Sequence, residues 1–258
     1  MTTVTHGLVL REAKYREADK ILTVLTPDLG KLTVTARASR RKGGGISAAA
    51  QLLVWSELTL SEYRGRWTLT DAATELEFRS LRRDLERLSL GSYFAELTDV
   101  MVPEGQSAPE LLSLLLNALY ALDRLDRPLT LVKAAFELRL LCLSGYAPGL
   151  DACAVCGREP EEPVLHLREG QLLCRSCQSA PGPVQSLNSA ALAAMRYITS
   201  CESKKLFSFR LDGESLRLLS RAAERYLLTQ LERGFRTLDF YDSISGPVLP
   251  ENGKKRGF

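Results

Sequence analysis

Four cysteines in two closely spaced pairs constrain this chain more than any other feature of its sequence. Cys153 and Cys156 form the first pair and Cys174 and Cys177 the second, in the pattern C-x2-C-x17-C-x2-C. Two cysteines three positions apart can direct both sulfurs to one ion, and Gly157 permits the tight turn that this requires. The spacing is that of a four-cysteine zinc site. Because four thiolates leave no position for water, we expect one structural Zn²⁺ rather than a catalytic metal.

The remaining cysteines and one histidine are weaker candidates. Disulfides, or a cluster that has lost its metal, are the alternatives to zinc, but clustered cysteines in a reducing compartment more often bind metal. His166 lies between the two pairs and could replace one cysteine as a ligand. Its apolar neighbours favour the alternative interpretation, an ordinary strand residue. Cys142, in an apolar run, is expected to be a small buried residue, and Cys201 has no predicted role.

The first 75 residues are predicted to form a small β-barrel. Short runs rich in Val, Thr, Leu and Trp, several of them alternating, are separated by turn signals at 27–30 and 64–66. The predicted strands are 8–10, 21–26, 31–38, 52–60 and 67–70. Five short strands favour an OB-fold barrel, with an SH3-like barrel as the alternative.

Beyond residue 80 the apolar spacing becomes helical, so the predicted fold class is α+β. Pro109 and Pro128 stand where two long apolar helices would begin, and the run 110–125 is predicted to be a central helix buried on almost every face. Further helices are expected at 189–199 and 213–234. We therefore expect an OB-fold domain at 1–79, a helical domain made of 80–150 and 181–244, a zinc-binding insertion at 151–180 and a disordered tail at 245–258.

The formal net charge of +3 hides an uneven distribution. No acidic residue occurs between Leu29 and Ser56, whereas five basic residues fall in this window and three glycines follow them. An OB barrel with a basic groove and aromatic residues is the usual arrangement for binding single-stranded nucleic acid. The predicted DNA contacts are Lys31, Arg37, Arg40, Arg41 and Lys42, with Arg64 and Arg66 at a hairpin tip.

Four aromatic residues among the first 75 offer faces on which bases could stack: Tyr15, Trp55, Tyr63 and Trp67. The alternative interpretation is a solvated basic loop with aromatic residues in the barrel core. For Trp55, which lies in an apolar run, a core position is the favoured interpretation.

A second basic feature lies on the last long predicted helix. Arg217, Arg221 and Arg225 are four residues apart and therefore share one face. Because Glu214 and Glu224 can pair with neighbours there, a solvated face is favoured over a second DNA contact or a docking stripe for an acidic partner. The residues that would extend the stripe are Arg196, Lys204 and Lys205.

The sequence contains no motif of a hydrolytic or redox enzyme. It has no P-loop, no Gly-x-Ser-x-Gly and no dinucleotide fingerprint, and its only two histidines supply little acid–base chemistry. We see no signal peptide and no apolar run of about 20 residues, so a cytoplasmic protein is expected.

The order of these parts resembles the bacterial RecO family of recombination-repair mediators over nearly the whole chain. In the N-terminal region the matching stretches are 7–10, 15–20, 22–26, 29–32 and 63–65. The most specific stretch runs from 136–141 through 145–148 into the first cysteine pair, and 173–177 completes the pattern. Leu52 and Leu53 depart from the family, which usually has an aromatic after a proline near this position, and 236–242 is the weakest match.

The resemblance implies an N-terminal OB-fold, a helical domain and an inserted zinc ribbon. It also implies binding of single- and double-stranded DNA, annealing of complementary strands, and association with RecR and single-stranded-DNA-binding protein. Help in loading RecA onto coated DNA, within the RecFOR pathway at the nucleoid, would follow. A zinc-ribbon protein-interaction scaffold in translation or transcription is the main alternative. A nuclease or helicase subunit with unrecognised carboxylate ligands is a further one.

Overall fold

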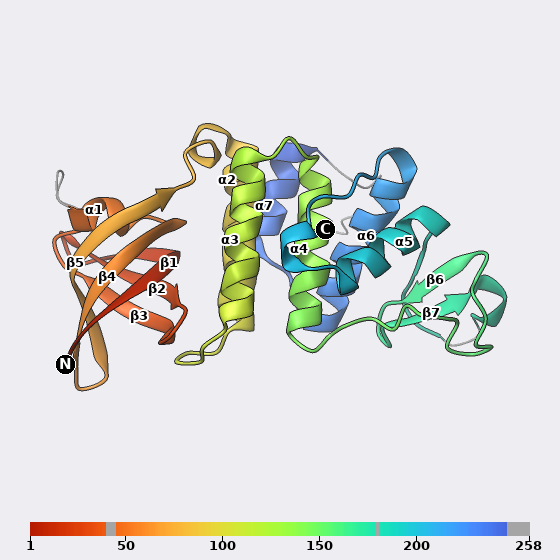
Figure 1. Cartoon of the computed structure of the whole chain (residues 1–258), viewed down its shortest axis with the longest axis horizontal. Coiled ribbons are helices and arrows are strands. Elements are labelled where there is room, and N and C mark those ends of the chain that lie inside the picture. Colours follow the sequence, from red (N-terminus) through yellow and green to blue (C-terminus); the bar gives the residue numbers. More distant parts are fainter. Residues whose placement is uncertain (40–44, 179–180, 247–258) are drawn as a thin grey trace, which may run out of the picture. The chain divides into compact units, whose positions relative to one another are not determined.

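The computed structural model divides into two compact units, Met1–Asp126 and Arg127–Phe258. The structure describes residues 1–39, 45–178 and 181–246. The first unit contains a barrel and two long helices, and the second is mainly helical with a small sheet (Figure 1). Within these ranges, no helix is long and apolar enough to span a membrane.

A closed five-stranded barrel begins the first unit. Its strands are β1 (Thr2–Tyr15), β2 (Asp19–Thr26), β3 (Gly30–Ala36), β4 (Val54–Tyr63) and β5 (Arg66–Glu77), with the short helix α1 (Gly45–Ala49) between β3 and β4. The strand order is β1-β2-β3-β5-β4, and β4 pairs back to β1. All pairs are antiparallel except β3 with β5. This is the OB-fold arrangement, so the predicted barrel is confirmed and the SH3-like alternative is set aside.

Alternating side chains fill the barrel. In β3, Leu32, Val34 and Ala36 are buried, while the residues between them are more exposed. They pack in one core with residues of the other strands, among them Val24 and Leu58. The period-two pattern of the sequence therefore places the barrel core correctly. β1 is much longer than the predicted three residues, because it pairs with both β2 and β4 along polar positions.

Two helices complete the first unit, α2 (Leu85–Met101) and α3 (Pro109–Arg124), after a 3-10 turn at Leu81–Arg83. The Asp84 side chain caps α2 by accepting a hydrogen bond from the Arg87 backbone N–H, and Pro109 occupies the start of α3. α3 leaves Ser113 and Tyr120 exposed. The prediction that this helix is buried on almost every face is therefore wrong, because α3 is amphipathic.

The loop after α2 lies directly against the barrel. Gly30 has φ 72°, and a Cβ there would stand 2.2 Å from the carbonyl oxygen of Gln106. The Glu104 side chain accepts a hydrogen bond from the Thr33 backbone N–H at 2.9 Å. Residues 80–126 thus belong to the same compact unit as the barrel. The sequence predicts instead that 80–150 and 181–244 form one helical domain separate from the barrel, and that division stays a prediction.

The second unit contains the helices α4 (Leu129–Leu143), α5 (Ser189–Ser200), α6 (Gly213–Leu231) and α7 (Arg236–Ser245). α4 is the helix that is buried on every side, since each residue from 131 to 138 is buried. This burial includes Lys133, whose Nζ lies 2.8 Å from Glu137 Oε1 and 2.6 Å from Glu224 Oε2 of α6. The paired carboxylates compensate the charge that the apolar surroundings would otherwise exclude.

A three-stranded sheet follows α4 in the chain. Its strands are β6 (Pro163–His166), β7 (Gln171–Cys174) and β8 (Val184–Ser186), in the order β7-β6-β8. A 3-10 turn at Arg175–Cys177 follows β7, and another at Ser203–Lys205 follows α5. The apolar spacing of the sequence does not predict α7. Most of the tail predicted to be disordered, residues 247–258, lies outside the described residues.

Candidate metal centre and nucleic-acid surface

The four predicted metal ligands come together at one point of the second unit. The Sγ atoms of Cys153, Cys156, Cys174 and Cys177 all lie within 4.8 Å of one another, and those of Cys156 and Cys174 are 3.7 Å apart. Four sulfurs arranged tetrahedrally around an ion, with metal–sulfur bonds of about 2.3 Å, are separated by about 3.8 Å. The cluster therefore fits a tetrahedral tetrathiolate site, as its sequence spacing predicts.

Backbone hydrogen bonds fix the turn that holds the first cysteine pair. The Gly157 N–H donates to the Cys153 carbonyl at 2.8 Å, and the Cys153 N–H donates to the Arg158 carbonyl at 2.9 Å. Gly157 adopts φ 70°, a left-handed conformation that glycine reaches without steric cost. Cys174 ends β7 and Cys177 ends the next 3-10 turn, so a strand and a turn bring the second pair to the first.

The surroundings of the sulfurs lower the pKa of two of the four thiols and raise that of the other two. Burial opposes ionisation of Cys153, but backbone N–H donors outweigh it and lower its pKa to about 6; one of them, from Cys174, lies 3.3 Å from the sulfur. Backbone hydrogen bonding also lowers the pKa of Cys156. Burial and the neighbouring thiols raise the pKa of Cys174 to about 12, and the contact with Cys156 followed by burial raises that of Cys177. A cation would relieve this mutual repulsion, because metal binding requires all four thiolates.

The other sulfur and imidazole groups stand outside this cluster in the described part of the chain. His166 lies in β6 with 3% of its surface exposed, and its Nδ1 accepts a hydrogen bond from the Glu169 N–H at 3.2 Å. The prediction of an ordinary strand residue is therefore confirmed. Cys142 and Cys201 are half-buried, and burial raises the pKa of Cys142.

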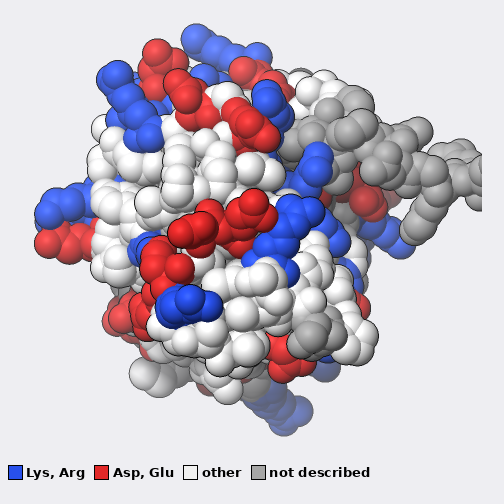
Figure 2. All heavy atoms as spheres, turned by 90° about the vertical axis from the view of Figure 1, so that its right-hand side faces the viewer, with Lys and Arg blue, Asp and Glu red and all other residues white. Residues whose placement is uncertain are grey.

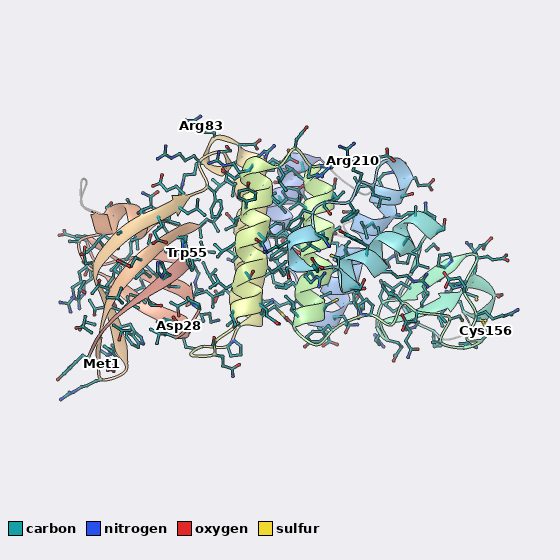
Figure 3. All side chains as sticks on the ribbon, viewed as in Figure 1. Met1, Asp28, Trp55, Arg83, Cys156 and Arg210 are labelled. Carbon is teal, nitrogen blue, oxygen red and sulfur yellow. The ribbon has the colours of Figure 1, made fainter. Side chains whose placement is uncertain are left out.

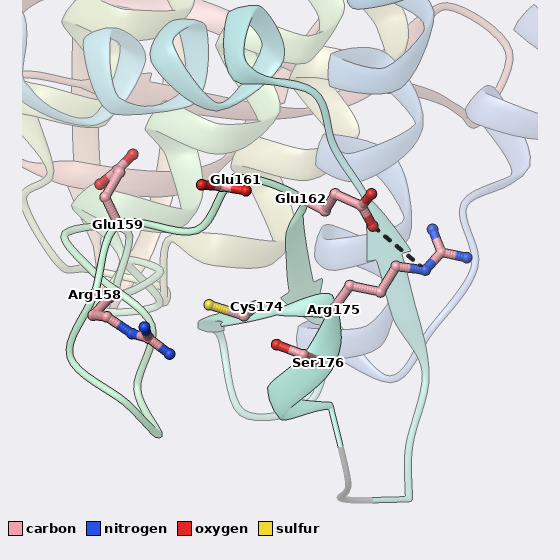
Figure 4. Close-up of a pocket in the computed structure, with 7 residues that line it drawn as sticks. All are labelled: Arg158, Glu159, Glu161, Glu162, Cys174, Arg175 and Ser176. Carbon is pink, nitrogen blue, oxygen red and sulfur yellow. Dashed lines mark ion pairs between the residues drawn. The ribbon is translucent and has the colours of Figure 1, made fainter.

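A polar pocket of about 390 Å³ lies beside Cys174, and its lining residues carry both signs of charge (Figure 4). Arg175 lies 3.8 Å from Glu162, and Glu159 pairs with Arg196 at 2.8 Å. Acidic and basic side chains are also intermingled over the face of the molecule shown in Figure 2. Neither the pocket nor that face concentrates positive charge for a nucleic acid.

The predicted DNA contacts fall on several parts of the barrel. Arg64 and Arg66 are exposed at the β4–β5 turn, and Arg37 is exposed just after β3. OB-folds bind oligonucleotides on the face of their second and third strands and with the β1–β2 and β4–β5 loops, so these three arginines occupy suitable positions. The other predicted contacts of the glycine-rich loop lie outside the described residues: Arg40, Arg41 and Lys42.

Lys31 differs from the other predicted contacts because it is engaged within the first unit. Its Nζ donates to the Asp99 backbone carbonyl and to Asp99 Oδ1, the latter at 2.9 Å. Only 13% of the Lys31 side chain is exposed. A phosphate would have to displace this ion pair, so the position favours a structural role.

Tyrosine–arginine pairs stand at two barrel turns, and one arginine is absent from the predicted contacts. Tyr63 is 69% exposed, and the Arg64 guanidinium lies 5.2 Å from the centre of its ring. At the β1–β2 turn Tyr15 is 40% exposed, and Arg16 lies at the same distance. Both arginines have a positive φ. The repeated Tyr-Arg dipeptide is the sequence signal that identifies Arg16.

The tryptophans occupy different environments. Trp67 is half-buried against the barrel core. Trp55, labelled in Figure 3, is half-buried outside that core and stacks on His6 with ring centres 5.7 Å apart. The favoured core position for Trp55 is therefore wrong, because its β4 neighbours Val54 and Ser56 are the residues that are fully buried.

The second basic feature contains side chains with structural contacts. Arg196 donates to the carbonyls of Leu150 and Asp151 and to both oxygens of Glu159, so it ties α5 to the start of the cysteine region. Arg225 donates to the Val184 carbonyl and to a side-chain oxygen of β8. The remaining members lie at the surface or partly buried, namely Lys204, Lys205, Arg217 and Arg221. A functional stripe at these positions stays a prediction.

An OB barrel joined in the chain to a helical unit with a four-cysteine cluster that could hold a metal ion defines a modular class of protein, whose type of barrel binds oligonucleotides or oligosaccharides. Comparison with known proteins identifies the family within this class. The family model described as "Recombination protein O N terminal" matches residues 1–75, and "Recombination protein O C terminal" matches residues 82–239.

Curated relatives named DNA repair protein RecO agree with these matches. Those of Acetivibrio thermocellus and Symbiobacterium thermophilum are each 32% identical, over 93% and 92% of this chain and 96% of each relative. That of Desulforudis audaxviator is 33% identical over 92% of this chain and 94% of the relative. The chain therefore belongs to the RecO family of DNA repair proteins.

Proposed function

We propose that this protein is a non-enzymatic mediator of recombinational DNA repair in the cytoplasm, at the nucleoid. It binds single- and double-stranded DNA, anneals complementary strands and, with RecR, helps to load RecA onto DNA coated by single-stranded-DNA-binding protein. The observation that carries the DNA-binding part is an OB barrel with exposed arginines at a binding loop and after β3. The names of the relatives support the repair role.

The mechanism is electrostatic. Arg37, Arg64 and Arg66 neutralise phosphates and release counterions, which gives affinity without reading the base sequence. The exposed rings of Tyr15 and Tyr63 offer stacking surfaces worth about 1–3 kcal/mol per base. Neutralised strands repel one another less, so two complementary strands can meet on the protein. No bond is made or broken in this process.

We also propose that the four-cysteine cluster holds one structural Zn²⁺. Four sulfurs within 4.8 Å of one another, with one pair 3.7 Å apart, are compatible with zinc or with an iron–sulfur centre, and an all-thiolate zinc site is closed to water. Cys153, Cys156, Cys174 and Cys177 would hold the ion and fix the β6–β7 hairpin against the preceding loop. Metal analysis should give about one zinc per chain. Iron with visible absorbance, or no metal in folded protein, would overturn this assignment.

A salt titration tests the proposed DNA-binding surface. We expect the Arg64→Ala/Arg66→Ala variant to bind a labelled single-stranded oligonucleotide more weakly. The slope of log affinity against log salt should become less steep by about 1.4, because each phosphate contact on a single strand contributes about 0.7. Fluorescence anisotropy at several salt concentrations measures both quantities.

The matched control removes the same charge from the second unit. Arg168 and Arg175 are exposed there, and Arg168→Ala/Arg175→Ala should leave the slope unchanged. An unchanged slope in the barrel variant, or equal losses in both variants, would contradict the proposed surface.

A further inference from the structure

A pocket on the outside of the barrel is not used by the proposed DNA contacts. It has a volume of about 340 Å³ and lies within the first unit, between β1, β4 and the N-terminal half of α3. Its apolar lining is formed by Trp55, Pro27, Pro109, Leu112 and Leu116. We call it the Trp55 pocket. Figure 3 labels Trp55 on the barrel and Asp28 in the neighbouring β2–β3 turn.

The aromatic wall of the Trp55 pocket is held in place. His6 stacks on Trp55 with an angle of 15° between the rings. His6 Nε2 in turn lies 3.0 Å from Glu75 Oε1 of β5. This chain of contacts fixes the orientation of the indole, so the pocket loses little side-chain freedom when it is filled.

Four acidic residues are neighbours of lining residues, either in the sheet or in the chain. Glu75 contacts His6, and Glu57 stands directly opposite His6 in the β1–β4 pairing. Asp28 is adjacent to Pro27 in the chain, and Glu110 is adjacent to Pro109; all four acidic residues are exposed. None of the described residues that line the pocket is a lysine or an arginine. The rim therefore repels phosphate and attracts a cationic partner.

The mouth of the pocket also offers hydrogen-bonding groups. Ser113 and Asn117 of α3 line it, and neither side chain forms a hydrogen bond to another described residue. A side-chain amide and a hydroxyl can accept from and donate to the backbone of an extended peptide. They supply the few polar contacts that fix the orientation of a segment whose main anchor is apolar.

We infer that the Trp55 pocket docks a partner protein through a short basic segment that inserts one large apolar or aromatic side chain. The volume is at the lower end of the range for binding pockets, which suits one or two side chains rather than a folded surface. An aromatic or apolar anchor in a desolvated pocket with a polar rim is the usual pattern of a small binding hot spot. This interaction is independent of the proposed DNA binding, since it uses the outer sides of β1 and β4 and not the basic turns.

A peptide selection tests the inference while the partner itself is unidentified. The full-length, zinc-loaded protein is offered a phage-displayed library of random peptides, with counter-selection on the Ser113→Arg variant. Ser113 is exposed, so this substitution fills the mouth and adds a positive charge there without disturbing the core. We expect enriched peptides to carry lysines or arginines around a Phe, Trp or Leu. Enrichment of acidic peptides, or no enrichment over the variant, overturns the inference.

Tryptophan fluorescence then locates the binding. The chain has two tryptophans, so Trp67→Phe leaves Trp55 as the only tryptophan, whose emission is excited selectively at a wavelength that tyrosine does not absorb. Titration with an enriched peptide that lacks Trp should shift this emission and saturate. Replacing the apolar anchor of the peptide by Ala, or Ser113 by Arg, should weaken binding by about tenfold or more. Calorimetry on the unmodified protein gives the same affinity if the Trp67→Phe variant is unstable.

Matched variants separate this site from the DNA-binding surface. Glu57→Lys should weaken peptide binding, whereas Glu161→Lys, the same charge change at an exposed position of the second unit, should not. Ser113→Arg should retain the single-stranded DNA affinity of the unmodified protein. Equal effects of both glutamate variants, or emission of Trp55 that does not respond to any enriched peptide, would refute the Trp55 pocket as the docking site.

Discussion

At the scale of single residues, Lys31 and Arg64 carry the same charge in different surroundings. Lys31 is half-buried in an ion pair with Asp99, whereas Arg64 lies exposed on a tyrosine ring at a turn. We expect Lys31→Met to lower the free energy of unfolding by about 1–3 kcal/mol, the usual contribution of a hydrogen bond between charged groups. The salt slope of DNA binding should stay unchanged. Denaturant unfolding and anisotropy measure the two effects, and a smaller slope with full stability would contradict this role.

The difference between these residues also shows what the sequence can predict at a site. The cysteine pairs are recognisable because their geometry is local, and each pair spans a single turn. The partner of Lys31 is 68 residues away in the chain, so only the folded unit shows that its charge is already neutralised. The position of Trp55 outside the core is likewise set by packing, not by its apolar neighbours in sequence.

At the scale of elements, the helix α7 contains Asp242, whose ionised form is disfavoured by its surroundings in the folded state. Burial, followed by repulsion from Glu224, raises the pKa of Asp242 to about 6, although Lys133 opposes this. In the unfolded chain the pKa of an aspartate is about 3.9, so the folded state binds the proton more tightly than the unfolded state does. The stability that this proton contributes is therefore fully present below about pH 4 and is lost as the pH rises through about 6. We expect Asp242→Asn to raise the free energy of unfolding at about pH 7 and above, and to leave it unchanged near about pH 4.

Urea unfolding at the two pH values tests this pH dependence. Glu161→Gln is the control, because Glu161 is an exposed acid of the same unit that does not contribute to the raised pKa of Asp242, and the variant should give no stabilisation at neutral pH. An equal change of Asp242→Asn at both pH values would exclude the ionisation of Asp242 as the cause.

The helices also show why burial patterns mislead. The run that becomes α3 is strongly apolar in sequence, yet one of its faces remains exposed. α4 contains Lys133 and Glu137 and is nevertheless buried all round, since Lys133 pairs with both Glu137 and Glu224. Apolar content therefore predicts that both helices exist but not which of them is central. The barrel strands are easier to predict because their period of two is tied to one core.

At the scale of the whole molecule, the two compact units differ in the residues that report on their unfolding. Both tryptophans lie in the first unit and all six cysteines in the second. If the cysteine cluster holds a structural zinc, a chelator should lower the unfolding temperature of the second unit, because the metal stabilises only the folded state. Circular dichroism should record this change while the transition in tryptophan emission stays in place. A chelator without effect on the helical signal would contradict a structural metal.

The most direct test of the central claim is strand annealing by the purified protein. Two complementary labelled strands are mixed with the protein, without nucleotide and with or without magnesium. We predict faster annealing than in buffer, no cleavage, and a loss of the effect in Arg37→Glu/Arg64→Glu but not in Arg168→Glu/Arg175→Glu. Cleavage that requires magnesium, or no acceleration and no binding of DNA, would contradict a non-enzymatic mediator that acts through its OB barrel.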